Sequence, residues 1–178
     1  MKTAMNQLIS DSVKLAFRRT ARSRWLGLLS LCLWFVSGCA TAPTIPGTKI
    51  ADTPLHRVLL QRVEEYRLAM EQREAGKLLT LAHPNYYEDS GTPTAQDDYA
   101  FAGLKRVLES RLSSVRWMRY LIRYRDVKVS GDHASVDIRY DLSFQLMTEL
   151  GEKWERRQND KRLELIKDGD RWLFISGF

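Results

Sequence analysis

Apolar positions from residue 53 to residue 115 recur every three or four residues, which is the spacing of an amphipathic helix. The first run follows Thr53-Pro54, a pair that suits the N-cap and the first position of a helix, and it predicts a helix to about Glu74. The apolar positions of this helix are Leu55, Leu59, Val63, Tyr66 and Met70. A helical turn over 77–81 is expected to end at His83-Pro84, because proline disfavours helical angles in the residue before it.

A second long helix is predicted after a loop that covers Asn85 to Pro93. Thr94 and Asp97 have the spacing of a capping box, in which two side chains bind the free amides of a helix start. The helix is expected to end near Ser113-Ser114. Apolar residues follow the capping box at helical spacing: Phe101, Leu104, Leu108, Leu112 and Val115.

After residue 115 the apolar period changes to two, which is typical of strands with one buried face. The clearest alternation places Val136, Ile138, Tyr140, Leu142, Phe144 and Leu146 on one face and Asp137, Arg139, Asp141, Ser143 and Gln145 on the other. Strands are predicted over 115–129, over 134–146, up to Ile166 and over 171–177, with turns at Gly131, Gly151 and Gly169. Helices followed by an antiparallel meander give the class α+β, because the sheet must bury its apolar face on the helices.

The order of these elements and the final hairpin LELIKDGDRWLFISGF resemble the nuclear transport factor 2-like superfamily, which includes ketosteroid isomerase and the SnoaL-type cyclases. The resemblance covers Thr53 to Phe178 and rests on element order, without a catalytic motif. It implies a cone-shaped fold in which N-terminal helices pack on a curved four-stranded antiparallel sheet and enclose a cavity. The candidate lining is aromatic: Tyr66, Tyr86, Tyr87, Tyr120, Tyr124, Tyr140 and Phe144. Such rings either bind a small amphipathic ligand or simply fill the core.

The N-terminal region has the composition of a signal peptide. Basic residues between Arg18 and Arg24 precede the uncharged run WLGLLSLCLWFV, which is shorter than a membrane-spanning helix needs. Val36-Ser37-Gly38-Cys39 then resembles the lipobox of bacterial lipoproteins, whose cysteine is lipidated and becomes the first residue of the mature chain. We therefore expect a removed signal peptide over 1–38, a tether over 39–52 that carries lipid on Cys39, and a folded domain over 53–178.

The lipobox also implies an address in the cell envelope. Ala40 follows the cysteine, and by resemblance to enterobacterial lipoproteins this favours the periplasmic face of the outer membrane. Two or more acyl chains on one residue would hold the domain at the bilayer permanently. An ordinary signal peptide that ends near Ala42 stays an alternative, and translation from Met5 instead of Met1 would give the same mature chain.

Charge and residue counts exclude several classes of function. The six bases and one acid before Cys39 account for +5 of the net charge of +6, so the mature chain is nearly neutral and lacks the basic surplus of a nucleic-acid binder. Cys32 and Cys39 both precede the domain, which therefore has no disulfide. The three histidines, His56, His83 and His133, lack metal-ligand spacing, so neither a metal nor a cofactor is predicted.

The sequence offers no catalytic motif. An isomerase or dehydratase of this fold needs a carboxylate or histidine base in its pocket, together with a hydrogen-bond donor. Candidate bases are His83, Asp89, Asp98 and Asp126, and Tyr66 or Tyr140 could donate. None of them matches a motif of those enzymes, so no catalytic residue is predicted.

Arginines gather on the first predicted strand. Arg119, Arg123 and Arg125 share one face by parity, and Arg139, Asp137 and Asp141 are expected opposite them on the next strand. This is either a solvated face with cross-strand ion pairs or a docking surface for an acidic partner or an anionic glycan.

The leading hypothesis is a membrane-anchored envelope lipoprotein whose domain binds a partner protein or a small ligand without catalysis. One alternative is an envelope enzyme of the isomerase or dehydratase type that acts on a small apolar compound in the cone. Another is an accessory subunit of an envelope assembly. A dimer is compatible with the sequence.

Overall fold

The computed structural model describes residues 42–89 and 98–178, which belong to one folded unit from Ala42 to Phe178. The expected signal peptide and Cys39 lie outside the described residues, and so do Thr94 and Asp97 of the expected capping box. No helix in the described ranges is long and apolar enough to cross a membrane.

Within the described residues, three helices precede the main sheet: α2 (Pro54–Gln72), α3 (Ala75–Leu81) and α4 (Phe101–Ser113). The predicted start of α2 is confirmed, because the amide of His56 donates to Oγ1 of the N-cap residue Thr53 at 3.1 Å and Pro54 occupies the first turn. The short helix α3 ends one residue before His83-Pro84, close to where the proline predicts its end.

The predicted start of the second long helix is wrong. Helix α4 begins at Phe101, because Tyr99–Ala100 are extended and form strand β2, which pairs antiparallel with β1 (Tyr87–Glu88). This pairing places the ring of Tyr99 parallel to that of Tyr86, with 6.4 Å between their centroids. The expected loop and the expected first turns of the helix thus each contribute one strand of a small two-stranded sheet.

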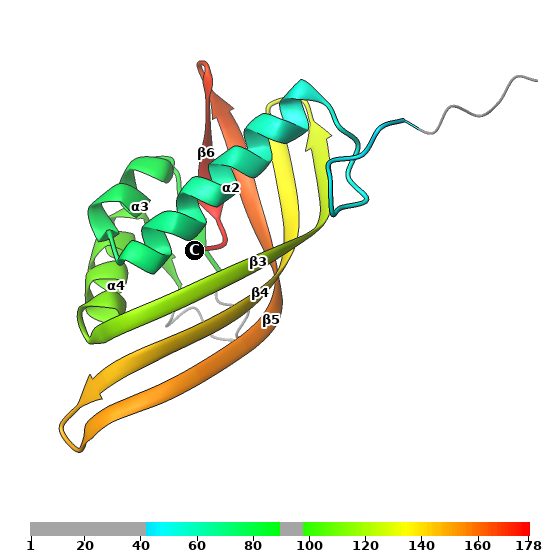
Figure 1. Ribbon diagram of the computed structural model, residues 1–178. Coiled ribbons are helices and arrows are strands. Elements are labelled where there is room, and N and C mark those ends of the chain that lie inside the picture. The colour runs from blue at the N-terminus through cyan, green and yellow to red at the C-terminus, as the bar shows by residue number, and fades with distance from the viewer. Residues whose placement is uncertain (1–41, 90–97) are drawn as a thin grey trace, which may run out of the picture. The chain divides into compact units, whose positions relative to one another are not determined.

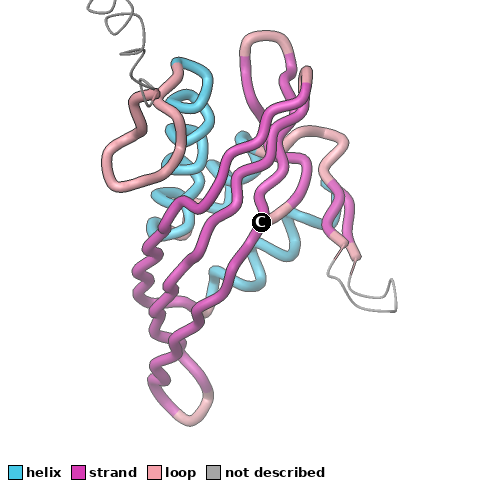
Figure 2. The backbone as a smooth tube through the Cα atoms, turned by 90° about the vertical axis from the view of Figure 1, so that its right-hand side faces the viewer, coloured by secondary structure: helices cyan, strands magenta, loops and turns pink. Residues whose placement is uncertain are grey.

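The predicted meander is confirmed as a four-stranded antiparallel sheet of order β3-β4-β5-β6. Its strands are β3 (Val115–Ser130), β4 (His133–Thr148), β5 (Gly151–Asp168) and β6 (Arg171–Ser176). Figure 1 shows the three helices on one face of this sheet, and the view turned by 90° in Figure 2 shows them behind the strands. The class is α+β.

The strand register gives the sheet an inner and an outer face. One inner row runs across three strands from Tyr120 through Leu142 to Arg157, and one outer row runs from Leu121 through Asp141 to Gln158. The inner face packs on the helices, where the largest fully buried side chains come from helices and strands alike. They are Tyr66, Tyr86, Phe174, Leu59, Leu78, Leu104, Ile138, Leu163, Leu165, Val63 and Val136.

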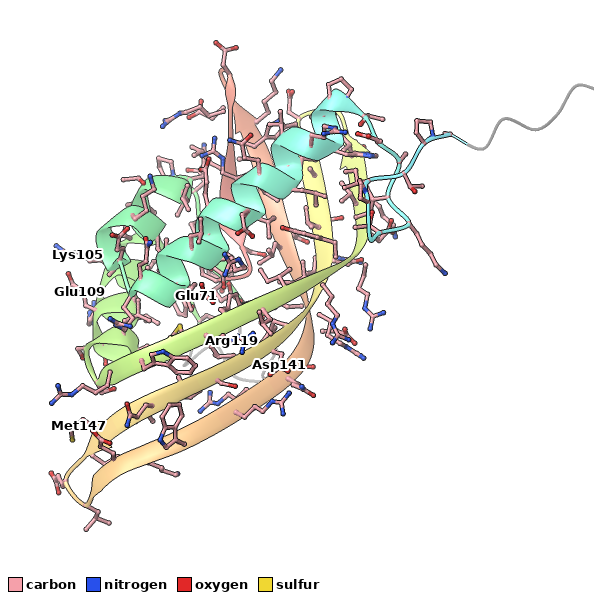
Figure 3. All side chains as sticks on the ribbon, in the orientation of Figure 1. Glu71, Lys105, Glu109, Arg119, Asp141 and Met147 are labelled. Carbon is pink, nitrogen blue, oxygen red and sulfur yellow. The ribbon has the colours of Figure 1, made fainter. Side chains whose placement is uncertain are left out.

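The free edge of β3 is covered by the C-terminal part of α2. The backbone amide of Tyr120 donates to Oε1 of Glu71 at 2.8 Å, and Nη1 of Arg67 donates to the Tyr120 carbonyl at 3.3 Å. Figure 3 labels Glu71 where α2 crosses β3. Unpaired backbone groups on a sheet edge invite pairing with another chain, and these two side chains satisfy them at one residue.

Residues 42–52, expected to form most of the tether, pack against the domain. Thr44 pairs with Ala51 in an isolated bridge, and the Asp52 amide donates to the Pro43 carbonyl at 2.7 Å. Ile50 is only 5 % exposed and belongs to the core. The segment was expected to be a tether because its sequence shows no apolar period. Packing of one isoleucine, Ile50, needs no such period.

Candidate functional site

A cavity of about 470 Å³ lies between the inner face of the sheet and helices α2 and α4. This volume falls in the range of about 300–1,000 Å³ that is usual for small-molecule sites. Four of the aromatic residues predicted to line a pocket are on its wall: Tyr66, Tyr120, Tyr140 and Phe144. Aliphatic and methionine side chains complete the apolar lining: Met70, Leu112, Val115, Met118, Leu142 and Leu146, together with the ring of Phe178.

The other three predicted aromatic residues lie outside this lining. Tyr86 is buried, and its hydroxyl donates to Oε2 of Glu88 at 2.5 Å. Tyr87 is 51 % exposed, and its hydroxyl donates to Asp98 at 2.7 Å. Tyr124 faces α2, where its hydroxyl donates to the Leu60 carbonyl at 3.4 Å. Neither loop position nor strand parity distinguishes these rings from those on the cavity wall.

Two tyrosine hydroxyls meet at the cavity. The oxygens of Tyr66 and Tyr120 are 3.4 Å apart, and their rings pack edge to face with centroids 5.9 Å apart. Burial raises the pKa of Tyr66 well above its usual value and that of Tyr120 to about 12. Both groups are therefore neutral at physiological pH, and either can donate a hydrogen bond.

Three cationic residues line the same cavity, and sequence analysis did not single them out. Arg111 lies in the last turn of α4, and Arg157 and Lys161 lie on the inner face of β5. The pKa of Lys161 is lowered to about 8, mainly by burial; the charge of Glu88 opposes this shift and the charge of Arg111 adds to it. Parity could have identified the two strand residues, because they alternate in phase with the buried Leu163 and Leu165.

The three cations differ in their contacts. The Arg157 guanidinium lies over the ring of Phe144 at 5.4 Å from its centroid and forms an ion pair with Glu155 at 3.2 Å. Arg111 lies near Tyr99: burial raises the pKa of that phenol, and the Arg111 charge partly offsets the shift. Within the described ranges, neither Arg111 nor Lys161 forms an ion pair.

None of the candidate bases lies on the described cavity wall. The ring of His83 accepts from the Asn85 amide at 3.0 Å, Asp98 accepts from Tyr87, and Asp126 accepts from the Val127 amide at 2.9 Å. Asp89 is exposed in the β1–β2 connection. The side chains in the described part of the lining include neither a carboxylate nor an imidazole, and no group of three such side chains in the described residues could hold a metal ion.

The outer face of the sheet carries cross-strand ion pairs, but not the expected ones. Asp137 pairs with Arg162 at 2.7 Å, Asp141 pairs with Arg156, and Arg139 pairs with Asp160. Hydrogen bonds from Arg156 and Gln158 lower the pKa of Asp141 to about 2. The partners come from β5, because Asp137 lies directly opposite Arg162 and Asp141 lies diagonally opposite Arg156. The prediction had paired the β4 charges with β3 alone.

The predicted docking arginines are divided by a bulge. Arg119 and Arg123 lie on the outer face, in register with Ser143 and Arg139, whereas Arg125 sits at the irregularity between Tyr124 and Asp126. Arg125 still approaches Asp160, at 3.9 Å. Figure 3 labels Arg119 and Asp141 on this side of the sheet.

An exposed tryptophan pair lies at one end of the outer face. Trp117 and Trp154 are 42 % and 61 % exposed, and their ring centroids are 5.3 Å apart across Gln145. Sequence analysis missed this pair. Extending the strand parity from β4 to β5 would have placed Trp154 on the polar face, where a large apolar ring is unusual.

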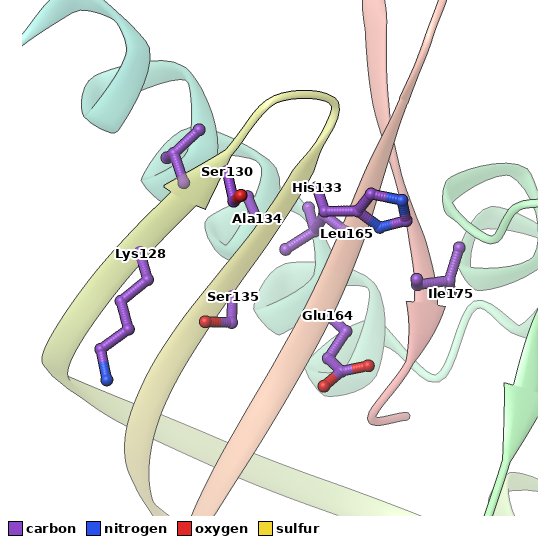
Figure 4. Close-up of a pocket in the computed structure, with 9 residues that line it drawn as sticks. Lys128, Ser130, His133, Ala134, Ser135, Glu164, Leu165 and Ile175 are labelled. Carbon is purple, nitrogen blue, oxygen red and sulfur yellow. The ribbon is translucent and has the colours of Figure 1, made fainter.

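A smaller depression of about 230 Å³ lies beside the β3–β4 turn (Figure 4). Lys128, His133 and Glu164 are its ionisable residues. No hydrogen bond or ion pair joins these three side chains in the described structure, so they form no catalytic arrangement.

Neither protein-family models nor curated proteins match this sequence. Solved structures do show the same architecture. A predicted aromatic ring hydroxylase from Novosphingobium aromaticivorans is 12 % identical with a TM-score of 0.60, and the match covers 71 % of this chain and 89 % of that one. A predicted dehydratase from the nuclear transport factor 2-like family of Streptomyces avermitilis is 16 % identical with a TM-score of 0.57, covering 70 % and 95 %.

A conserved protein from Planctomyces limnophilus is 8 % identical with a TM-score of 0.59, and the match covers 68 % of this chain and 91 % of that one. At identities this low, the likeness concerns the fold and not the activity. The element order, the four-stranded sheet and these structures agree: the chain has the nuclear transport factor 2-like fold.

Proposed function

We propose that this chain is a lipid-anchored cell-envelope protein whose domain binds a small amphipathic ligand in its cavity without catalysis. One observation carries the proposal: the cavity of about 470 Å³ is walled by apolar rings and aliphatic side chains, and its described polar groups are tyrosines and cations. An apolar wall with a few placed polar groups is typical of sites that bind small molecules.

The composition of the wall favours binding over the chemistry known for this fold. Proton abstraction beside a carbonyl needs a carboxylate or histidine base within hydrogen-bonding reach of the substrate. The side chains of the described wall provide neither. The tyrosine pair Tyr66 and Tyr120 can orient a ligand by donating hydrogen bonds, but neutral phenols with raised pKa values are poor bases.

The sequence around Cys39 supports the anchor. A lipidated Cys39 would hold the domain close to the bilayer surface. Residues 42–52 pack on the domain, so only residues 40 and 41 would separate it from the lipid-bearing cysteine. A ligand that partitions between membrane and protein would meet the cavity close to its source. The proposed localisation is compatible with a carrier or sensor of amphipathic molecules.

Mass spectrometry of small molecules that co-purify with the full chain from native membranes tests the cavity. Leu142→Trp fills the cavity from the inner face, and Leu121→Trp is its control, because Leu121 is 44 % exposed on the outer face. We expect a molecule that accompanies the wild type and Leu121→Trp but not Leu142→Trp. Equal amounts with all three folded proteins would contradict the proposal.

A Cys39→Ser variant tests the anchor. We expect it to leave the membrane fraction and to lose the mass of the acyl chains, while an unchanged fractionation and an unchanged mass would refute the lipid anchor. Circular dichroism of the variant checks that its domain still folds, since Cys39 precedes the packed segment.

The exposed Trp117–Trp154 pair supports a second candidate function, an accessory subunit of an envelope assembly. Tryptophan and arginine are enriched in protein interfaces, and Arg119 lies in the row next to this pair. A photo-crosslinking amino acid in place of Trp154 should label a specific partner in native membranes. Arg119→Glu with Arg123→Glu should abolish the crosslink, and an unchanged crosslink would remove this candidate; a product of two chains would identify a dimer.

A further inference from the structure

We propose that the ligand of the cavity is an organic anion whose charged oxygens bind between Arg111 and Lys161 while its apolar body contacts the aromatic wall. The inference rests on the proposed function and specifies its ligand class. It concerns residues of two distant elements, α4 and β5, that meet at one cavity.

The charge balance of the cavity is uneven. Arg111 and Lys161 are close enough that the charge of one disfavours the charge of the other. Among the described carboxylates, Glu88 acts on Lys161, and its Oε2 is already engaged by the Tyr86 hydroxyl at 2.5 Å and the Gly177 amide at 2.7 Å. Two like charges beside an apolar wall are unfavourable without a counter-ion, and a bound anion would supply one.

The polar groups of the cavity are mainly hydrogen-bond donors. Lysine and arginine side chains donate and cannot accept, and the hydroxyls of Tyr66 and Tyr120 are neutral and can donate too. Donors that line one cavity favour a ligand with acceptor oxygens. Carboxylate is the simplest such group, and its bonds to charged donors are stronger than those between neutral groups.

The apolar part of the cavity wall indicates the chemistry of the uncharged part of the ligand. Met118, Leu142 and Phe144 stand on the inner face of β3 and β4, and Met70 faces them from α2. Methionine side chains adapt their shape and contact aromatic rings favourably. A ring system or a short branched chain attached to the carboxylate would therefore pack against this wall.

The alternative explanation for each cation is structural. An arginine in the last turn of a helix interacts favourably with the helix dipole, which accounts for the position of Arg111. The helix dipole does not account for Lys161, which lies on strand β5. Its side chain is partly buried and forms no ion pair within the described residues. Replacement of Lys161 is therefore the most direct test of the proposed anion site.

Two probes of the same shape test the proposal: 2-naphthoate, which is an anion, and 2-naphthamide, which is neutral. Both are titrated by calorimetry into the full chain, held in amphipol after purification from membranes. We expect 2-naphthoate to bind at least about tenfold more tightly than 2-naphthamide. Lys161→Gln and Arg111→Gln should each weaken 2-naphthoate about tenfold and leave 2-naphthamide unchanged. Arg119→Gln is the control, because it removes an equal charge from the outer face.

The outcomes separate this inference from the proposed function. Three results would contradict the proposal that the ligand is an anion: equal affinity of the two probes, no saturable binding of 2-naphthoate, or no effect of Lys161→Gln on its affinity. If Leu142→Trp still abolishes binding of both probes, the cavity remains the site and only the ligand class is wrong. If Leu142→Trp leaves both affinities unchanged while circular dichroism shows a folded protein, the cavity is not the site and both proposals fail.

Discussion

Lys161 of β5 and Arg111 of α4 line the same cavity, and the positive charge of Arg111 adds to burial in lowering the pKa of Lys161. The two residues are 50 positions apart in the sequence, and the sheet register together with the end of α4 brings them together. The fold thus places two positive charges beside the apolar side chains of one cavity. Such an arrangement costs stability and is expected where it serves binding.

The first prediction concerns the pH dependence of stability. Because the pKa of Lys161 falls from 10.5 to about 8 on folding, the unfolded chain binds more protons between these values, and the free energy of unfolding rises with pH there. Relative to Lys161→Met, which does not titrate, we expect the wild type to gain about 1 kcal/mol from pH 7.5 to pH 9.5, allowing for partial solvent exposure.

Urea unfolding of both proteins at the two pH values measures this gain. Tyr66 and Tyr120, whose pKa values are raised by burial, stay neutral over this range, so the comparison isolates the titration of Lys161. A difference in stability that stays constant over this range would show that folding does not shift the pKa of Lys161.

The second prediction concerns Gly177, which follows β6. Its φ of +98° is in the region that favours glycine, and a Cβ there would lie 2.5 Å from the Arg162 carbonyl oxygen. Gly177→Ala must move backbone, so we expect a loss of about 3 kcal/mol in thermal or urea unfolding. Gly131→Ala is the control, because φ is +58° but no atom lies within 4 Å, and we expect a loss of about 1 kcal/mol. Equal losses would argue against the close approach at Gly177.

The third prediction concerns the contact between α2 and the edge of the sheet. Glu71→Ala leaves the Tyr120 amide without its acceptor, and we expect a loss of about 1–2 kcal/mol in the free energy of unfolding. Glu74→Ala, an exposed acid whose side chain forms no cap, is the matched control and should change little. Because Tyr120 lines the cavity, Glu71→Ala should also weaken binding of 2-naphthamide; unchanged stability would mean that water replaces the carboxylate.

Much of the fold could be predicted from the sequence because its apolar periods are regular. The alternation of Val136 to Phe144 determines which face of β4 is buried, and Thr53-Pro54 marks the start of α2 within one residue. The start of α4 was predicted too early because Thr94 and Asp97 imitate a helix start by local pattern alone. Pairing of Tyr99 with Glu88 is a tertiary event that local spacing does not reveal.

The site was predicted only in part, for a similar reason. Parity places Tyr120, Tyr140 and Phe144 on the inner face, and these residues do line the cavity. Arg157 and Lys161 were missed because they resemble solvent-facing charges in a polar strand, although they share the parity of the buried Leu163 and Leu165 and the register against β4 places them on the inner face. Charged residues on a predicted inner face therefore deserve the same scrutiny as aromatic ones.

The central claim is that the cavity binds a small ligand, and three methionines report on it directly. Met70 and Met118 line the cavity, while Met147 is exposed near the tip of the β4–β5 hairpin, as labelled in Figure 3. Removal of the expected signal peptide would leave these as the methionines of the mature chain. In NMR spectra of the ¹³C-methyl-methionine-labelled full chain, we predict that 2-naphthoate saturably shifts the Met70 and Met118 signals and leaves Met147 unchanged. Shifts confined to Met147, or none at Met70 and Met118, would contradict the account.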